Sequence, residues 1–242
     1  MRRGEYLEER IPDALQHPDN LWFGFSTRAR LIYYNKDRVA EPPQTYEALA
    51  DSKYEGQICI RSSTNIYNLS LLASIIATDG AETAEAWAEG VKNNLAREPQ
   101  GGDTDQLRGL ISGECDIAVA NSYYFARALR TDVDGLSEHV DQIGWVFPNQ
   151  DGRGTHVNVS AAAVLANAPN RANAIRFLEY LASDSAQDYF ASGNDEYPVV
   201  EGVGLSASVT QLGEFKRDDL NLSALGEYQA EAQSIFNTVG FK

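Results

Sequence analysis

The sequence predicts an α/β protein built on a parallel sheet that helices cover on both faces. Short apolar runs typical of strands alternate with longer stretches in which apolar residues recur at helical spacing. Such alternation is typical of units in which a helix connects two parallel strands. The length of 242 residues, with 43% hydrophobic content, is enough for one large domain or two lobes.

Each element follows from a local pattern. Residues 1–20 are polar and rich in turn formers, so we expect a lead-in without regular structure. In the helix expected at 81–95, small and apolar residues recur every three or four positions. Gly113 ends the next helix and Pro148 ends a strand. The expected strands cover about residues 30–34, 57–60, 116–120, 143–147 and 156–160. The expected helices cover a short turn at 45–49 and longer segments at 66–77, 81–95, 104–112, 123–130, 171–182, 184–191 and 222–237.

Charge excludes two classes of partner. The net charge is −15, from 20 basic and 35 acidic residues. Nucleic acids and anionic membranes are bound by basic surfaces, so neither is expected to bind. No apolar run reaches the 18–20 residues or so that cross a bilayer. Arg2 and Arg3 make the start of the sequence basic, but residues 4–10 (GEYLEER) follow where an export signal has its apolar segment, so no export signal is expected.

The two cysteines do not form a zinc site or a disulfide framework. Cys59 and Cys115 each lie at the front of an apolar run expected to form a strand. If those strands are neighbours, one bridge is possible, provided that the Cα atoms approach within about 7 Å. Two buried free thiols fit the sequence equally well.

Three tyrosines follow two of the expected strands. The strand at 57–60 leads through Ser62, Ser63 and Thr64 to Tyr67, and the strand at 116–120 leads to Tyr123 and Tyr124. Ligands of open α/β sheets bind beyond the carboxyl ends of the strands, where helices begin. Phenolate oxygen is a hard donor suited to hard cations, and a phenol with a pKa of about 10 ionises at neutral pH only beside a strongly charged ion. Among the metal ions, ferric iron fits this requirement best.

Ordinary packing is the alternative explanation for such tyrosines, with the rings buried and the hydroxyls at the surface. Tyr33 and Tyr34 illustrate it, because neighbours in a strand point to opposite faces and cannot share one ion. His17, His139 and His156 lack metal-ligand spacing. No nucleophile elbow or Ser/His/Asp arrangement indicates an enzyme.

Four segments closely resemble the periplasmic ferric-binding proteins of ABC importers, in the branch prominent in cyanobacteria and marine bacteria. They are residues 22–30 (WFGFSTRAR), 59–63 (CIRSS), 113–124 (GECDIAVANSYY) and 147–156 (FPNQDGRGTH). The resemblance covers the chain from about Ile11 onward. It implies two α/β lobes of the type II binding-protein class that close on the ion, one formed by residues 1–30 and 152–203 and the other by 31–151 and 204–242. It further implies a monomer that delivers iron to a permease and its ATPase.

The resemblance also implies roles for individual residues. Tyr67 matches the lone tyrosine ligand of the family, and Tyr123 and Tyr124 match its tyrosine pair. Arg28 and Arg127 match arginines that line the cleft, and Ser62, Ser63 and Thr64 lie where related members hold an anion beside the metal.

The sequence departs from the family pattern at its start. The family begins with further strands and helices that carry another ligand, and these have no counterpart here, so we expect an incomplete first lobe. Two other functions stay open: a cleft for a small oxyanion or organic acid held by Arg28, Arg127 and the 62–64 segment, or a remnant that binds nothing.

Overall fold

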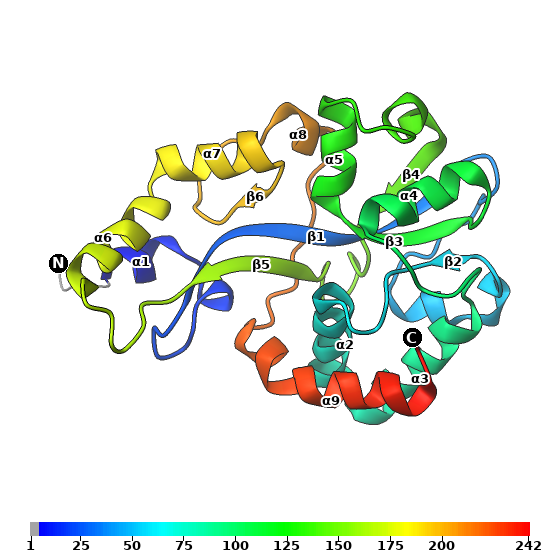
Figure 1. Ribbon diagram of the computed structural model, residues 1–242, viewed down its shortest axis with the longest axis horizontal. Coiled ribbons are helices and arrows are strands. Elements are labelled where there is room, and N and C mark those ends of the chain that lie inside the picture. The colour runs from blue at the N-terminus through cyan, green and yellow to red at the C-terminus, as the bar shows by residue number, and fades with distance from the viewer. Residues whose placement is uncertain (1–4) are drawn as a thin grey trace.

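The molecule is elongated, and two paired strands run side by side between its two unequal parts (Figure 1). The computed structural model describes residues 5–242, so Arg2 and Arg3, considered for an export signal, lie outside the described residues. The strands are β1 Phe23–Asn35, β2 Ile58–Cys59, β3 Ile117–Asn121, β4 Ile143–Val146, β5 Val157–Ala162 and β6 Tyr197–Pro198. The α-helices are α1 Glu5–Arg10, α2 Ile66–Asp79, α3 Ala81–Asn93, α4 Asp103–Ser112, α5 Ser122–Arg130, α6 Arg171–Leu181, α7 Asp184–Asn194, α8 Ala207–Leu212 and α9 Ser223–Val239. Short 3-10 helices cover Asp13–Leu15, Glu47–Ala50, Ser52–Tyr54 and Ser137–Gln142.

The predicted parallel sheet is wrong for most of the strands. Strand β1 pairs antiparallel with β3 and β4 through its second half and with β5 and β6 through its first half. Among the paired strands of residues 5–242, only β2 and β3 run parallel. The alternation of strands and helices correctly predicts this βαβ unit, in which α2, α3 and α4 connect β2 to β3. It fails for β1, because β1 crosses the whole molecule and the strands on both sides of it run in the opposite direction.

Helices cover both faces of the sheet in the larger part, as predicted. Leu31 and Tyr33 of β1 pack with α4, α5 and α8 on one face. Ile32, between them, packs with α2, α3 and α9 on the other face. Tyr34 packs on the same side as Ile32, which confirms that Tyr33 and Tyr34 point to opposite faces. This alternation along β1 is the period-2 pattern of a buried strand.

The smaller part has its own apolar core, and two of its short elements were not predicted. Leu7 and Ile11 are buried against Phe23 and Leu178, so residues 5–10 form helix α1 rather than the expected irregular lead-in. Strand β6 is two residues long, and helix α8 in the larger part is six. Elements this short carry too few apolar positions to show a period, which is why the sequence did not reveal them.

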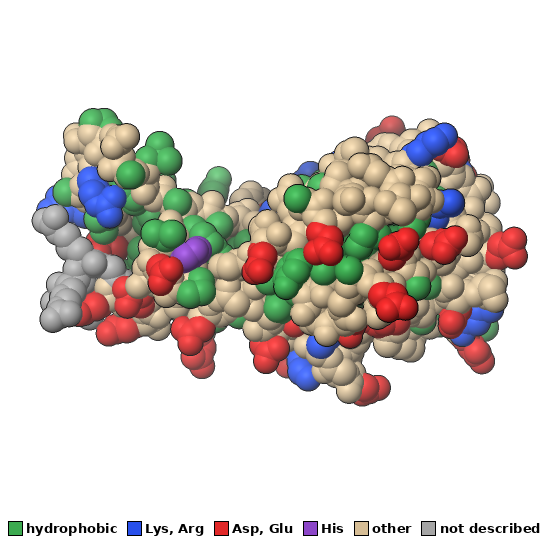
Figure 2. Space-filling model, turned by 90° about the horizontal axis from the view of Figure 1, so that it is seen from below, with side chains coloured by type: hydrophobic (Ala, Val, Ile, Leu, Met, Phe, Trp, Pro, Cys, Tyr) green, Lys and Arg blue, Asp and Glu red, His purple; other side chains and the backbone are tan. Residues whose placement is uncertain are grey.

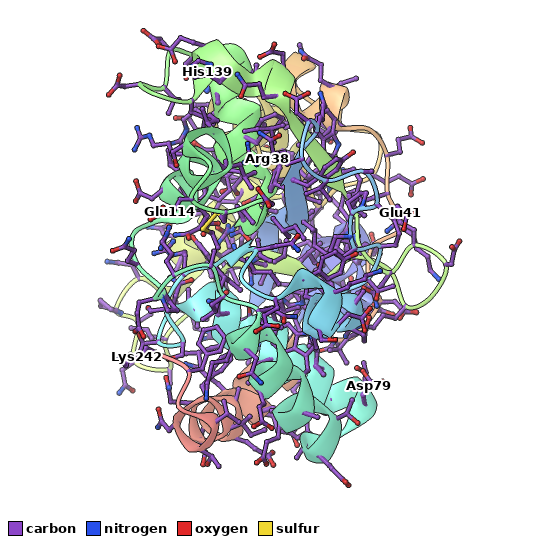
Figure 3. All side chains as sticks on the ribbon, turned by 90° about the vertical axis from the view of Figure 1, so that its right-hand side faces the viewer. Arg38, Glu41, Asp79, Glu114, His139 and Lys242 are labelled. Atoms are coloured by element: carbon purple, nitrogen blue, oxygen red, sulfur yellow. A yellow bond between two sulfur atoms is a disulfide. The ribbon has the colours of Figure 1, made fainter. Side chains whose placement is uncertain are left out.

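A disulfide joins Cys59 and Cys115, whose Cα atoms lie 5.8 Å apart. Figure 3 shows the bond in yellow beside the labelled Glu114. Both cysteines are buried against helix α4 at Gly109. A Cβ atom at Gly109 would lie 2.8 Å from the sulfur of Cys115, so only glycine fits there. The bridge decides between the two alternatives left open by the sequence, and it fastens β2 to the start of β3.

Removing this bridge should lower stability strongly. The bridge closes a loop over a sequence separation of 56, for which the entropy of the unfolded chain predicts a loss of about 4 kcal/mol. We expect the double variant C59A/C115A to lose about 3–4 kcal/mol of unfolding free energy in urea. Unchanged stability in the double variant would show that the bridge does not constrain the unfolded chain.

Acidic side chains are spread over the face of the molecule shown in Figure 2, as the net charge of −15 requires.

Within residues 5–242, no helix combines the length and the apolar character that crossing a membrane demands.

Candidate functional site

The three tyrosines come from two loop–helix junctions at one edge of the sheet. Strands β2 and β3 are parallel neighbours, with Cys59 opposite Ala118, so the chain leaves both strands at the same edge. Tyr67 is the second residue of α2, and Tyr123 and Tyr124 lie in the first turn of α5. The hydroxyl oxygens of Tyr67 and Tyr123 are 3.3 Å apart. This distance confirms that residues 56 positions apart in the sequence converge.

Tyr123 and Tyr124 also lie close to each other. Their ring centroids are 4.1 Å apart, with an angle of 32° between the ring planes. All three tyrosines are partly exposed, so solvent or a ligand can reach the cluster. Neighbours in the first turn of a helix point about 100° apart, which lets both lean toward an opening at its start.

Local hydrogen bonds fix both helix starts. The side chain of Asn65 accepts a bond of 3.1 Å from the backbone N–H of Tyr67 and caps α2. At the other junction, the carboxylate of Asp103 accepts a bond of 2.7 Å from the backbone N–H of Asn121, directly before α5. Each tyrosine-bearing turn is thereby held by a side chain of a polar residue.

Burial determines the charge state of two phenols. It raises the pKa of Tyr123 above the ordinary value of 10, and the neighbouring phenols of Tyr124 and Tyr67 raise it further. Burial also raises the pKa of Tyr124. Both phenols are therefore neutral at neutral pH, and a ligand that needs phenolate must displace their protons.

Arginines surround the tyrosines. Of the two predicted, Arg28 lies 6.0 Å from the ring centroid of Tyr67, and Arg127 lies 5.6 Å from that of Tyr123. Arg28 also donates to Ser160 at 2.6 Å and forms an ion pair with Glu196 at 3.4 Å. The structure thus brings both predicted arginines to the cluster.

Sequence reasoning missed two further arginines. Arg30 and Arg61 lie 5.7 and 5.5 Å from the ring centroid of Tyr67. The spacing of Arg28 and Arg30 was the available signal for the first, because residues two apart in a strand share a face. No local pattern distinguished Arg61, which lies in the loop after β2.

The residues of the predicted anion segment make hydrogen bonds within the protein. The hydroxyls of Ser62 and Thr64 lie 3.1 Å apart, and the backbone N–H of Ser63 donates to the carbonyl of Lys242 at 2.9 Å. Asn65 supplies the capping bond at the start of α2. Whether Ser62, Ser63 and Thr64 hold an anion stays a prediction.

Within residues 5–242, the other metal-binding residue types form no competing site. Across the described residues 5–242, no cluster of three or more His, Cys, Asp or Glu side chains could hold a metal. His156 is buried, with its Nε2 atom 3.2 Å from the hydroxyl of Ser70. Burial and the nearby Arg153 and Arg30 lower the pKa of His156 to about 3, so this imidazole is neutral.

Comparison with known proteins places the chain in a family. The sequence profile of the bacterial extracellular solute-binding proteins matches residues 7–215. Iron uptake protein A2 of Synechocystis sp. is 50% identical, over 99% of this chain and 70% of that protein. Iron uptake protein A1 of the same organism is 48% identical, over 99% of this chain and 67% of that protein.

Solved structures give the same result. The Trichodesmium protein IdiA (FutA), in complex with iron and citrate, superposes with a TM-score of 0.94 at 49% identity, over 98% of this chain and 75% of that one. The ferric binding protein of Campylobacter jejuni superposes with a TM-score of 0.92 at 41% identity, over 98% of this chain and 76% of that one. The expected two-lobed fold of type II binding proteins is thereby confirmed.

Proposed function

This chain belongs to the bacterial extracellular solute-binding proteins, and we propose that it captures ferric iron through the phenol oxygens of Tyr67, Tyr123 and Tyr124. The observation that carries this proposal is the distance of 3.3 Å between the hydroxyl oxygens of Tyr67 and Tyr123. Two oxygens this close can contact one ion together, and the ring of Tyr124 lies beside that of Tyr123.

The chemistry of the cluster favours a trivalent ion. Hard oxygen donors select hard cations, and calcium or magnesium would be held by carboxylates and carbonyls instead. Because burial raises the pKa of Tyr123 and Tyr124, only a strongly charged ion can displace their protons at neutral pH. Three phenolates carry three negative charges, so the ferric complex adds no net charge beside the arginines.

The relatives support the same cargo. Two of them are named iron uptake proteins, and the Trichodesmium structure contains iron and citrate. We infer that this chain likewise serves an ABC-type iron importer, as a monomer that delivers its ion to the permease and ATPase subunits. The disulfide fits an oxidising compartment such as the periplasm.

The lobes are proposed to close on the ion. Residues 1–30 and 152–203 would form one lobe, and residues 31–151 and 204–242 the other. Strands β1 and β5, which run side by side between the two parts in Figure 1, would provide the hinge.

Titration with ferric citrate tests the proposed function. We expect one ferric ion to bind per chain and to produce a visible phenolate-to-iron charge-transfer band. The control is citrate without iron. Colourless binding of citrate itself would identify a site for organic acids held by Arg28 and Arg127, and absence of binding by a folded chain would identify a remnant.

A further inference from the structure

A buried polar network lies directly behind the tyrosines. Arg30 and Asp103 form an ion pair at 2.7 Å, and both side chains are 0% exposed. Burying a charged pair is costly, and an apolar pair of the same volume would fill the space at lower cost. An apolar pair could not, however, hydrogen-bond to the neighbouring strands and helices.

The hydrogen bonds of this pair reach both tyrosine-bearing junctions. Arg30 donates at 2.8 Å to the side chain of Asn68, which directly follows Tyr67. The same carboxylate oxygen of Asp103 that accepts from Arg30 also accepts from the backbone N–H of Asn121, two residues before Tyr123. Arg30 donates to the side chain of Asn121 as well, at 3.3 Å.

Arg61 completes the network. Its guanidinium lies 3.6 Å from the second carboxylate oxygen of Asp103. Its carbonyl oxygen accepts a bond of 2.6 Å from the side chain of Asn68. Five segments, namely β1, the loop after β2, α2, α4 and the end of β3, are thereby joined through five side chains.

We propose that Arg30 and Asp103 are positioning residues, which hold the tyrosines of α2 and α5 at the spacing that one ferric ion requires. The proposal rests on the proposed function. Groups that orient metal ligands from behind typically change metal affinity about 10- to 100-fold when they are altered. Neither Arg30 nor Asp103 would contact the ion itself.

Two variants probe the two ends of the network. Asp103→Asn keeps the shape of the side chain but removes the charge that holds Asn121, and Asn68→Leu removes the link next to Tyr67. We expect each variant to bind ferric iron about 10- to 100-fold more weakly in competition with citrate, with a weaker or shifted charge-transfer band. The iron affinity of the double variant should fall by less than the product of the two single fold-changes, because both substitutions act through Arg30.

Asp218→Asn is the matched control. Asp218 is also mostly buried and pairs with an arginine, Arg153, at 3.1 Å, but it makes no bond to this network. We expect it to lower the melting temperature while leaving iron affinity and the band unchanged.

The outcomes separate the two proposals. A wild-type chain that gives no coloured iron complex overturns the proposed function. The positioning role is overturned by a different result. In that result the wild type gives a coloured complex, Asp103→Asn and Asn68→Leu match the wild type in iron affinity and band, and both lose stability as Asp218→Asn does. If Asp103→Asn does not fold, the affinity and band of Asn68→Leu decide alone.

Discussion

Replacing Tyr123 by phenylalanine should lower the affinity for ferric iron roughly 100- to 1000-fold and remove most of the visible band. Tyr123 is close to both other phenols. Its hydroxyl oxygen lies 3.3 Å from that of Tyr67, and its ring centroid lies 4.1 Å from that of Tyr124. Removing one partner from a buried charged group typically costs about 3–5 kcal/mol, and the lower part of that range, about 3–4 kcal/mol, corresponds to this loss. Competition with citrate measures the affinity, and absorbance measures the band.

Tyr34→Phe is the matched control for this substitution. Tyr34 is also a partly buried member of a tyrosine doublet, but it lies within β1 and packs against the core formed by α2, α3 and α9. The Tyr34→Phe variant should bind iron as the wild type does. Equal affinity in the Tyr123→Phe and Tyr34→Phe variants would refute a ligand role for Tyr123.

Acidification should release the ion steeply. Burial raises the pKa of Tyr123 and Tyr124, so both phenols are protonated in the iron-free protein at and below neutral pH. Binding as phenolate then releases one proton per phenol, and the affinity must rise with pH and fall as pH drops. If three phenols each release one proton, the affinity for ferric iron should change about 1000-fold per pH unit, at a fixed concentration of free ferric ion.

The number of released protons checks this prediction independently. In weakly buffered solution, the wild type should release about three protons per ion, and Tyr124→Phe about two. A chelator that sets the free ferric concentration must be corrected for its own proton release. An affinity that does not change between pH 5 and pH 7 would exclude phenolate ligation.

The convergence of the tyrosines could be predicted because it depends on local rules. Two parallel strands end at the same edge, and a helix begins after each, so Tyr67 and Tyr123 had to approach one another. The direction of β1 could not be predicted in this way, since an apolar run shows that a strand exists but not which way its neighbours run.

The network behind the tyrosines was equally beyond sequence reasoning. Arg30 and Asp103 are 73 positions apart. An acidic residue at the start of a helix, such as Asp103 in α4, is expected for capping reasons alone. Its burial and its bonds to Arg30 and Asn121 arise from tertiary packing, which no local pattern records. The disulfide likewise required the Cα distance of 5.8 Å to be known.

Resonance Raman spectroscopy of the iron-loaded protein, excited within the visible band, tests the central claim most directly. It reports which side chains are bonded to the ion. We expect enhanced tyrosinate ring vibrations that weaken in each of the Tyr67→Phe, Tyr123→Phe and Tyr124→Phe variants. A spectrum without tyrosinate vibrations, or one that none of the three substitutions changes, would contradict capture of ferric iron by these three phenols.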